Sequence, residues 1–123
     1  MIHPAKSIRT FIGAKNFEES TRFYQTLGFT VKPLSKGFSL VTVKENICFY
    51  LQDYYSKEWC ENCMIFLEVE QLESYWEAMK VLGLPDKFKG VKLSTIKHEE
   101  WGSEFFLHDP AGVLWHFGVF KNN

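Results

Sequence analysis

The chain contains an internal repeat. Residues 16–29 resemble residues 71–84, which lie 55 positions further along. Each copy follows a short β-type run, carries Glu at its third position and ends with Leu-Gly before an apolar residue. Such a repeat constrains the architecture, because two similar segments are expected to form equivalent units that bury a core together. The chain has 123 residues, 46% of them hydrophobic, so we expect one domain over residues 1–123 with a shared core.

The same order of elements is predicted around each copy. Runs rich in β-branched and aromatic residues predict strands, and apolar stripes that end at Gly28 or Gly83 predict helices. The first half predicts a strand at 7–14, a helix at 17–27 and strands at 29–32, 38–43 and 47–52. The second half predicts a strand at 64–69, a helix at 72–82 and strands at 91–97, 104–108 and 113–120.

The sequence therefore predicts an α+β fold of two tandem βαβββ modules. The first module covers about 7–52, an irregular junction covers 53–62, and the second module covers about 63–120. Side chains alternate between the two faces of a strand, so the apolar set Ile65, Leu67 and Val69 is expected under the helices. The opposite face, which carries Phe66 in the second module and Phe11 in the first, is the candidate cleft.

Charge and composition narrow the function classes. A net charge of −1 and a pI near 6.4 provide no basic excess for nucleic acid or for an anionic membrane. The sequence shows neither a secretory signal nor an apolar stretch that would span a bilayer, and three cysteines fit a reducing compartment, so we expect a cytoplasmic protein. Cys60 and Cys63 have the spacing of a metal or redox pair, but no second pair follows, so we interpret them as part of a loop.

Several motifs resemble those of the vicinal oxygen chelate superfamily, which contains glyoxalases, extradiol dioxygenases and bleomycin-resistance proteins. The motifs are Phe23-Tyr24 before Leu27-Gly28-Phe29, then Trp101-Gly-Ser-Glu104-Phe105, and Asp109-Pro-Ala-Gly112 before the last strand. They extend over nearly the whole chain in the family's order. The resemblance implies a curved mixed sheet with a cupped cleft, and usually a homodimer.

Metal-dependent members of that family hold a divalent ion in the cleft. Carried onto this sequence, the four ligand positions are Arg9, Tyr50, Met64 and His116. Arg9 has no lone pair to offer and stays protonated, and Met64 is a soft thioether, so only His116 suits such an ion. We therefore expect neither a metal nor another cofactor, as in the bleomycin-resistance branch, whose Trp-Gly-x-Glu-Phe motif this chain also resembles.

These arguments predict a metal-independent protein of the glyoxalase and bleomycin-resistance type that sequesters a hydrophobic or aromatic small molecule, as antibiotic-resistance proteins do. Binders of bleomycin in the family carry an acidic surface, whereas this chain is nearly neutral and offers Arg9 to the cleft, which favours a neutral or mildly anionic ligand. The predicted binding residues are Arg9, Phe11, Tyr50, Met64, Phe66, Glu68, Trp101, Glu104 and His116.

Several alternatives remain open from the sequence. A metal-dependent lyase, isomerase or dioxygenase would rebuild its site from His116, Glu104, Glu68 and Gln52. A dimeric interaction module would fill the cleft with its own side chains. Arg9 either captures a ligand carboxylate or pairs with Glu68 or Glu104, and the latter is favoured because a buried charge must be balanced.

Other residues carry narrower expectations. His116 is either a ligand contact or general base, or a strand histidine satisfied by a polar neighbour, and Glu104 is a candidate acid or base. Trp59 and its neighbours Tyr54 and Tyr55 either close over the cleft or contact a second subunit. The remaining histidines, His3, His98 and His108, are expected to face solvent.

Overall fold

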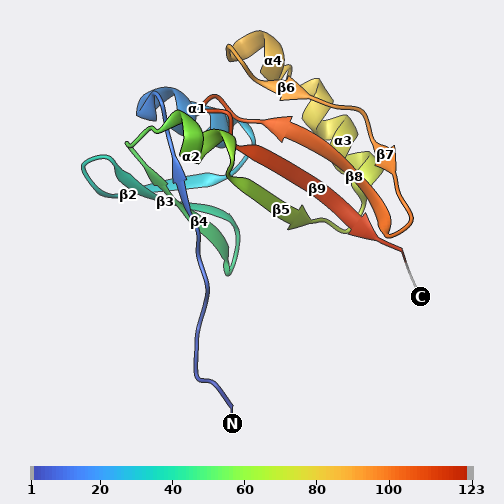
Figure 1. Ribbon diagram of the computed structural model, residues 1–123, viewed down its shortest axis with the longest axis horizontal. Helices are drawn as coiled ribbons and strands as arrows, with labels where there is room; N and C mark the ends of the chain where they lie inside the picture. Colours follow the sequence, from blue (N-terminus) through green and yellow to red (C-terminus); the bar gives the residue numbers. More distant parts are fainter. Residues whose placement is uncertain (1, 122–123) are drawn as a thin grey trace.

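The structure is a computed structural model that describes residues 2–121, and its chain order repeats one supersecondary plan (Figure 1). The first module contains β1 (Phe11–Gly13), α1 (Phe17–Thr26), β2 (Thr30–Ser35), β3 (Phe38–Lys44) and β4 (Ile47–Gln52). A short helix, α2 (Lys57–Glu61), lies in the junction. The second module contains β5 (Met64–Glu68), α3 (Leu72–Val81), α4 (Leu84–Lys87), β6 (Lys92–Leu93), β7 (Lys97–His98), β8 (Gly102–His108) and β9 (Leu114–Phe120). The predicted α+β class and the repeated plan are confirmed.

Each module forms its own sheet. The first sheet has the strand order β1-β4-β3-β2, and the second has the order β5-β9-β8-β6 with β7 also paired to β8. In both sheets the first strand of the module runs parallel to its last strand. The single curved sheet that the resemblance implied is therefore two sheets within one protomer, because the edge strands β1 and β5 do not pair with each other.

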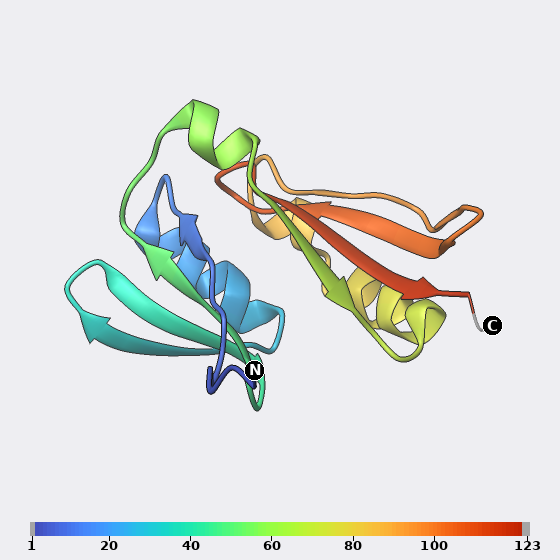
Figure 2. The ribbon, with the colours of Figure 1, turned by 60° about the horizontal axis from the view of Figure 1, so that its bottom comes forward.

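The two modules are joined by a core that lies on the helix side of both sheets. The ring of Trp115 in β9 lies 5.8 Å from Tyr24, 5.9 Å from Phe29 and 5.3 Å from Phe49, all three of the first module. These rings are almost fully buried. The modules consequently meet through aromatic packing, which leaves the faces that point away from the helices uncovered (Figure 2).

A buried polar chain crosses the same boundary. The indole N–H of Trp115 donates to the Tyr24 hydroxyl at 3.0 Å, and that hydroxyl donates to Asp109 Oδ2 at 2.6 Å. Asp109 Oδ1 accepts from the backbone N–H groups of Ala111 and Val113. Burial raises the pKa of Asp109 to about 6, although these donors favour the carboxylate and oppose the rise. The Asp-Pro-Ala-Gly turn is thus tied to helix α1 of the other module.

Helix ends follow their sequence signals in part. Asn16 caps α1 by accepting from the backbone N–H of Glu19 at 3.0 Å, as its position before a carboxylate-rich first turn predicts. Gly28 and Gly83 adopt the left-handed conformation that ends a helix, with φ of 94° and 63°. Beyond Gly83, however, Pro85 lies in the first turn of α4. A proline is tolerated there because its missing N–H would have no intrahelical partner.

Three expected elements differ from the structure. The strand expected at 91–97 is two short strands, because Ser94 interrupts the ladder and its hydroxyl accepts from the N–H of Phe106 at 2.8 Å. The strand expected at 7–14 is regular only over Phe11–Gly13, and residues 2–10 are exposed. The junction expected to be irregular contains α2, whose first turn is capped by the Ser56 side chain. None of the helices in residues 2–121 is long and apolar enough to cross a bilayer.

Candidate functional site

The uncovered face of the first sheet carries a group of aromatic residues, Phe11, Phe38 and Tyr50, with Arg9 beside them. Phe11 stands opposite Tyr50 in the parallel pairing of β1 and β4, and their ring centroids are 5.0 Å apart. The Phe38 ring lies 6.1 Å from Phe11 and 5.1 Å from Tyr50. Arg9 donates to the Tyr50 hydroxyl at 3.0 Å, and its guanidinium carbon lies 5.7 Å from the centre of that ring. We call these four residues the first-sheet cluster.

Arg9 therefore does not pair with a carboxylate of the second module. The expectation that Glu68 or Glu104 balances it is wrong for the protomer, since Arg9 lies just before β1 of the first sheet and both acids belong to the second sheet. Arg9 is fully exposed, so water solvates its charge and no buried partner is required. Its guanidinium remains available to an anion that approaches the rings.

The uncovered face of the second sheet carries a larger cluster around Gly118. A Cβ at Gly118 would lie 2.7 Å from the Phe66 ring, so glycine allows this ring to approach β9 closely. The Phe66 ring contacts Trp101 at 5.9 Å, Phe120 at 5.6 Å and His116 at 6.3 Å between centroids. These four residues, together with Glu104, are called the second-sheet cluster. Three of its rings are well exposed, with Phe66 43%, Trp101 38% and Phe120 53% accessible.

His116 and Glu104 form a hydrogen-bonded pair inside this cluster. His116 Nδ1 lies 2.9 Å from Glu104 Oε1, and both side chains are largely buried. Because a carboxylate only accepts, Nδ1 carries the proton, and Nε2 is the ring nitrogen available to a ligand. The edge of Phe106 also meets the imidazole, with centroids 5.0 Å apart. The pair fixes the orientation of the imidazole, which suits either ligand recognition or proton transfer.

The four inherited metal positions do not fit a divalent ion. Arg9 and Tyr50 hydrogen-bond to each other on the first sheet, whereas Met64 and His116 belong to the second sheet. Within residues 2–121, no three His, Cys, Asp or Glu side chains are grouped so that they could hold a metal ion. In the alternative ligand set, His116 and Glu104 do meet, but Gln52 lies in β4 of the first sheet, opposite Gly13. No chemical step is therefore assigned to a metal.

The predicted binding residues fall into two separate groups in one protomer. Figure 2 shows the two sheets splayed apart, and no hydrogen bond, ion pair or ring contact in the described part of the chain joins the two clusters. The first group comprises Arg9, Phe11 and Tyr50. The second group, on the uncovered face of the second sheet, comprises Met64, Phe66, Glu68, Trp101, Glu104 and His116.

Sequence reasoning missed several residues of this surface. Phe120 is two alternations beyond His116 on β9, so the period of two would have placed it on the same face. Phe38 is the first residue of β3, and no predicted binding residue on that strand indicated which face Phe38 occupies. Trp59 of the junction packs closely against β1, because a Cβ on Gly13 would lie 2.5 Å from its ring. Both expected roles of this tryptophan, closing over the cleft and contacting a second subunit, stay predictions.

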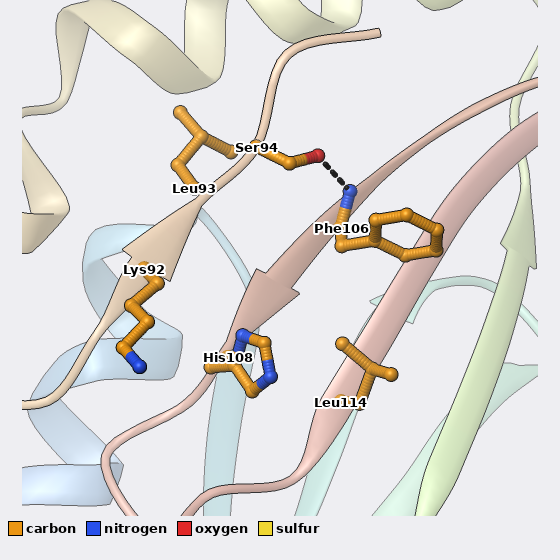
Figure 3. A pocket seen from close by; sticks show the side chains of 6 residues that line it. All are labelled: Lys92, Leu93, Ser94, Phe106, His108 and Leu114. Carbon is orange, nitrogen blue, oxygen red and sulfur yellow. Dashed lines mark hydrogen bonds between the residues drawn. The ribbon is translucent and has the colours of Figure 1, made fainter. Parts of the chain in front are cut away.

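A hollow of about 330 Å³ also lies on the uncovered face of the second sheet, close to the second-sheet cluster (Figure 3). It is lined by residues of β6, β8 and β9 and by the segment after β6, namely Lys92, Leu93, Ser94, Phe106, His108 and Leu114. His108 was expected to face solvent, yet it is half-buried here because it stands between Lys92 and Leu114 in the sheet. Burial and the neighbouring Lys92 ammonium lower the pKa of its imidazole.

No protein-family model matches the sequence, and no curated protein is similar to it in sequence. Solved structures do match the fold. A bleomycin-binding protein complexed with bleomycin superimposes with a TM-score of 0.78 at 16% identity, over 95% of this chain and 100% of the other. The bleomycin-binding protein of Streptomyces verticillus complexed with copper(II)-bleomycin gives 0.78 at 18% identity, over 98% and 100%.

A third solved structure, a glyoxalase/bleomycin resistance protein from Catenulispora acidiphila, superimposes with a TM-score of 0.72 at 17% identity, over 95% of this chain and 100% of the other. Identities this low establish the fold rather than a shared ligand. Full coverage of all three structures agrees with the repeated module plan. The chain therefore has the fold of the vicinal oxygen chelate superfamily, in the form seen in bleomycin-binding and glyoxalase/bleomycin-resistance proteins.

Proposed function

We propose that the protein binds a hydrophobic or aromatic small molecule without a metal and sequesters it, acting in the cytoplasm. The observation that carries this proposal is the set of exposed rings on the uncovered sheet faces, above all Phe66, Trp101 and Phe120 around Gly118. Contiguous exposed aromatic surface on a small domain marks a site of binding. Structural neighbours that bind bleomycin support small-molecule binding on this fold. The free cysteines of the described chain are compatible with a reducing compartment.

A homodimer would complete the cleft. The first-sheet and second-sheet clusters are separate in one protomer, and each offers half of an aromatic lining. A two-fold related copy would place the first-sheet cluster of each subunit opposite the second-sheet cluster of the other, giving two equivalent clefts. Residues 2–8 support this arrangement because they are exposed, with Ile8 97% accessible, and precede Thr10, whose carbonyl accepts from the backbone N–H of Tyr50 in β4. Apolar side chains in such an arm gain stability when a partner covers them.

The polar groups suggest the character of the ligand. Arg9 offers a guanidinium beside the rings of Phe11 and Tyr50, and His116 offers Nε2 beside Phe66. A planar ligand that is neutral or carries an oxyanion would stack on the rings and hydrogen-bond to these groups. The near-neutral charge of the chain supports a ligand other than the strongly cationic bleomycin.

A second candidate function is supported by the His116–Glu104 pair. An imidazole held by a carboxylate is the arrangement that a general base requires, so turnover of a bound ligand is the alternative to sequestration. The His116→Gln variant separates the two functions. It would retain stacking and binding under sequestration but would lose any turnover of the bound compound.

The test is a thermal-shift screen of planar aromatic compounds, combined with sedimentation velocity over a range of protein concentrations. We expect a dimer, and at least one compound that raises the melting temperature of the wild type but not of Trp101→Ala or Phe66→Ala. Val81→Ala is the control, because Val81 is an exposed apolar residue, 83% accessible, that lies on α3 and away from the uncovered sheet faces. A wild type that no compound in the panel stabilises would contradict the proposed binding role, and a strict monomer would contradict the shared cleft.

A further inference from the structure

The hollow beside His108 is lined by both apolar and polar side chains. Phe106 and Leu114 form an apolar wall, and Lys92 and His108 stand at one end of it (Figure 3). Phe106 is also the residue whose edge meets His116, so the hollow lies one row of side chains from the second-sheet cluster. Its volume of about 330 Å³ is at the lower end of the range for small-molecule sites.

The sheet register fixes the polar end of the hollow. Lys92 stands directly opposite His108 in the antiparallel pairing of β6 and β8, and His108 stands opposite Leu114 in the pairing of β8 and β9. The three side chains therefore form one row across the uncovered face. Because regular strands hold this row, its geometry does not depend on a loop.

The positive charge in this row belongs to Lys92, which forms no close ion pair with a described carboxylate. Among residues 2–121, the ion pair whose nitrogen and oxygen lie within 4.0 Å is that of His116 with Glu104. Lys92 therefore has no acidic partner at that distance in this part of the chain. Glu61 is the acidic residue that lines an adjoining hollow of about 320 Å³, which shares Lys92, His108 and Leu114. The stem of Glu61 packs against Gly112, where a Cβ would lie 3.0 Å from its Cγ. The row thus offers one free ammonium and one imidazole to the hollow.

We propose that Lys92 and His108 form an anion-recognition subsite, and that the ligand is an apolar or aromatic molecule that carries a carboxylate or phosphate group. The anionic group pairs with the Lys92 ammonium and accepts a hydrogen bond from the His108 imidazole, while the apolar body lies on Phe106 and Leu114 toward His116. This inference rests on the proposed function, because it assigns a ligand class to the same face of the second sheet.

Three naphthalene compounds test the subsite: 2-naphthoate, 2-naphthyl phosphate and neutral 2-naphthol. Calorimetric titration of the wild type at neutral pH and low salt is expected to show that at least one anion binds more tightly than 2-naphthol, by about 3–10-fold, as one partly exposed charge-assisted contact allows. The tighter of the two anions identifies the group that is recognised. Lys92→Gln is expected to remove this preference and to leave the affinity for 2-naphthol unchanged.

Lys36→Gln is the matched control, because Lys36 is an exposed lysine in the turn between β2 and β3 of the first module and should keep the preference. A second readout follows the His108 imidazole by nuclear magnetic resonance, with His98 as an internal reference. A bound anion is expected to raise the pKa of His108, because it offsets the positive charge of Lys92 that lowers it.

Failure of this inference can be told apart from failure of the proposed function. If Lys92→Gln retains the anion preference, or if both compound classes bind equally to the wild type, the subsite is wrong although the aromatic site remains. If none of the three compounds binds to the wild type, the subsite is also wrong. The aromatic site is then judged by the compound screen and its Trp101→Ala and Phe66→Ala variants.

Discussion

The two modules share a backbone plan but differ in the chemistry of their uncovered faces. Phe11 faces Tyr50 in the first sheet, and the equivalent pair in the second sheet is Phe66 and His116. The first face offers rings and one exposed guanidinium, whereas the second adds an oriented imidazole and a lysine that has no acidic partner within 4.0 Å among residues 2–121. The repeat therefore preserves strand register, and the polar functions are concentrated in the second half.

The two sheets also differ in where a glycine allows an aromatic ring to approach. On the first sheet Gly13 lies in the first strand of its module and is covered by Trp59 from the junction. On the second sheet Gly118 lies in the last strand and is covered by Phe66 from the neighbouring strand. In each case the missing side chain lets an aromatic ring approach the sheet closely. The first ring comes from the junction between the modules, while the second belongs to an exposed aromatic cluster.

The largest expected effect comes from the boundary between the modules. Trp115→Ala removes the ring that contacts Tyr24, Phe29 and Phe49, and it should lower the free energy of unfolding by about 3–5 kcal/mol. Denaturant unfolding followed by circular dichroism provides the measurement, with Val81→Ala on α3 as the surface control. Two well-separated transitions in the wild type would show that the modules do not share a core.

The next largest effect is the contribution of Asp109 to the pH dependence of the free energy of unfolding. Its pKa is about 6 in the folded protein because of burial, against an ordinary value of 3.8. Between about pH 4 and pH 6 the unfolded chain has released a proton that folded Asp109 still binds, so stability falls as the pH rises. The contribution is fully present below about pH 4, and about 3 kcal/mol is lost by the time the pH passes 6.

Comparison with Asp109→Asn isolates the contribution of Asp109 to the pH dependence of stability. The other carboxylates titrate in both proteins, so their contributions cancel in the difference. The variant is expected to be less stable than the wild type at low pH, since the Tyr24 and backbone contacts are disturbed. The difference between the two proteins should shrink as the pH rises from 4 to 6.5. A difference that stays constant across this window would show that Asp109 is ionised throughout, and the polar chain would then be an ordinary hydrogen-bond network.

A pair of ring deletions tests whether both faces contribute to one site. If a dimer brings the clusters together, Phe11→Ala and Phe66→Ala should each weaken binding of 2-naphthol by about 3–10-fold, the effect of losing one aromatic contact. Fluorescence or calorimetric titration measures both variants under the same conditions. Loss of affinity in Phe66→Ala alone would mean that the second sheet binds the ligand without the first.

The smallest expected change concerns metal content. Protein purified without chelators should contain well under one equivalent of Fe, Mn, Ni or Zn, because Arg9 and Met64 are unsuitable donors at two of the four inherited positions. Elemental analysis of the wild type and of His116→Ala should give the same low value. One equivalent in the wild type that disappears in the variant would favour the metal-dependent alternative.

Much of the fold could be predicted from local signals. The repeat, the glycines after each helix and the alternation along β5 and β9 indicate the module plan and the correct faces of Phe66 and His116. These signals act over a few residues, so tertiary packing did not override them. The division of the expected strand at 91–97 into β6 and β7 was missed, and so was helix α4, because these features depend on one serine hydroxyl and on a proline at a helix start. Such features are set by a single side chain rather than by a periodic pattern.

The candidate site was only partly predictable. Alternation places each residue on the correct face of its own strand, yet it cannot say which strands stand beside each other across 40 or more residues. The contact of Arg9 with Tyr50, 41 residues apart, depends on the parallel pairing of β1 with β4. His116 and Glu104 lie only 12 residues apart on the consecutive strands β8 and β9. The hollow around Lys92 and His108 likewise exists because β6 lies at the edge of β8. His108 carried no sequence signal that distinguished it from a solvent-facing strand-end histidine.

The sequence by itself determined the repeated modules, the face on which each strand residue lies and the unsuitability of Arg9 and Met64 as metal ligands, because these follow from chain periodicity and side-chain chemistry. Only the tertiary structure decided that the strands form two separate sheets joined through Trp115, Tyr24 and Asp109. That arrangement depends on aromatic packing between segments far apart in the chain. The same packing leaves the two ring clusters uncovered and separate within a protomer.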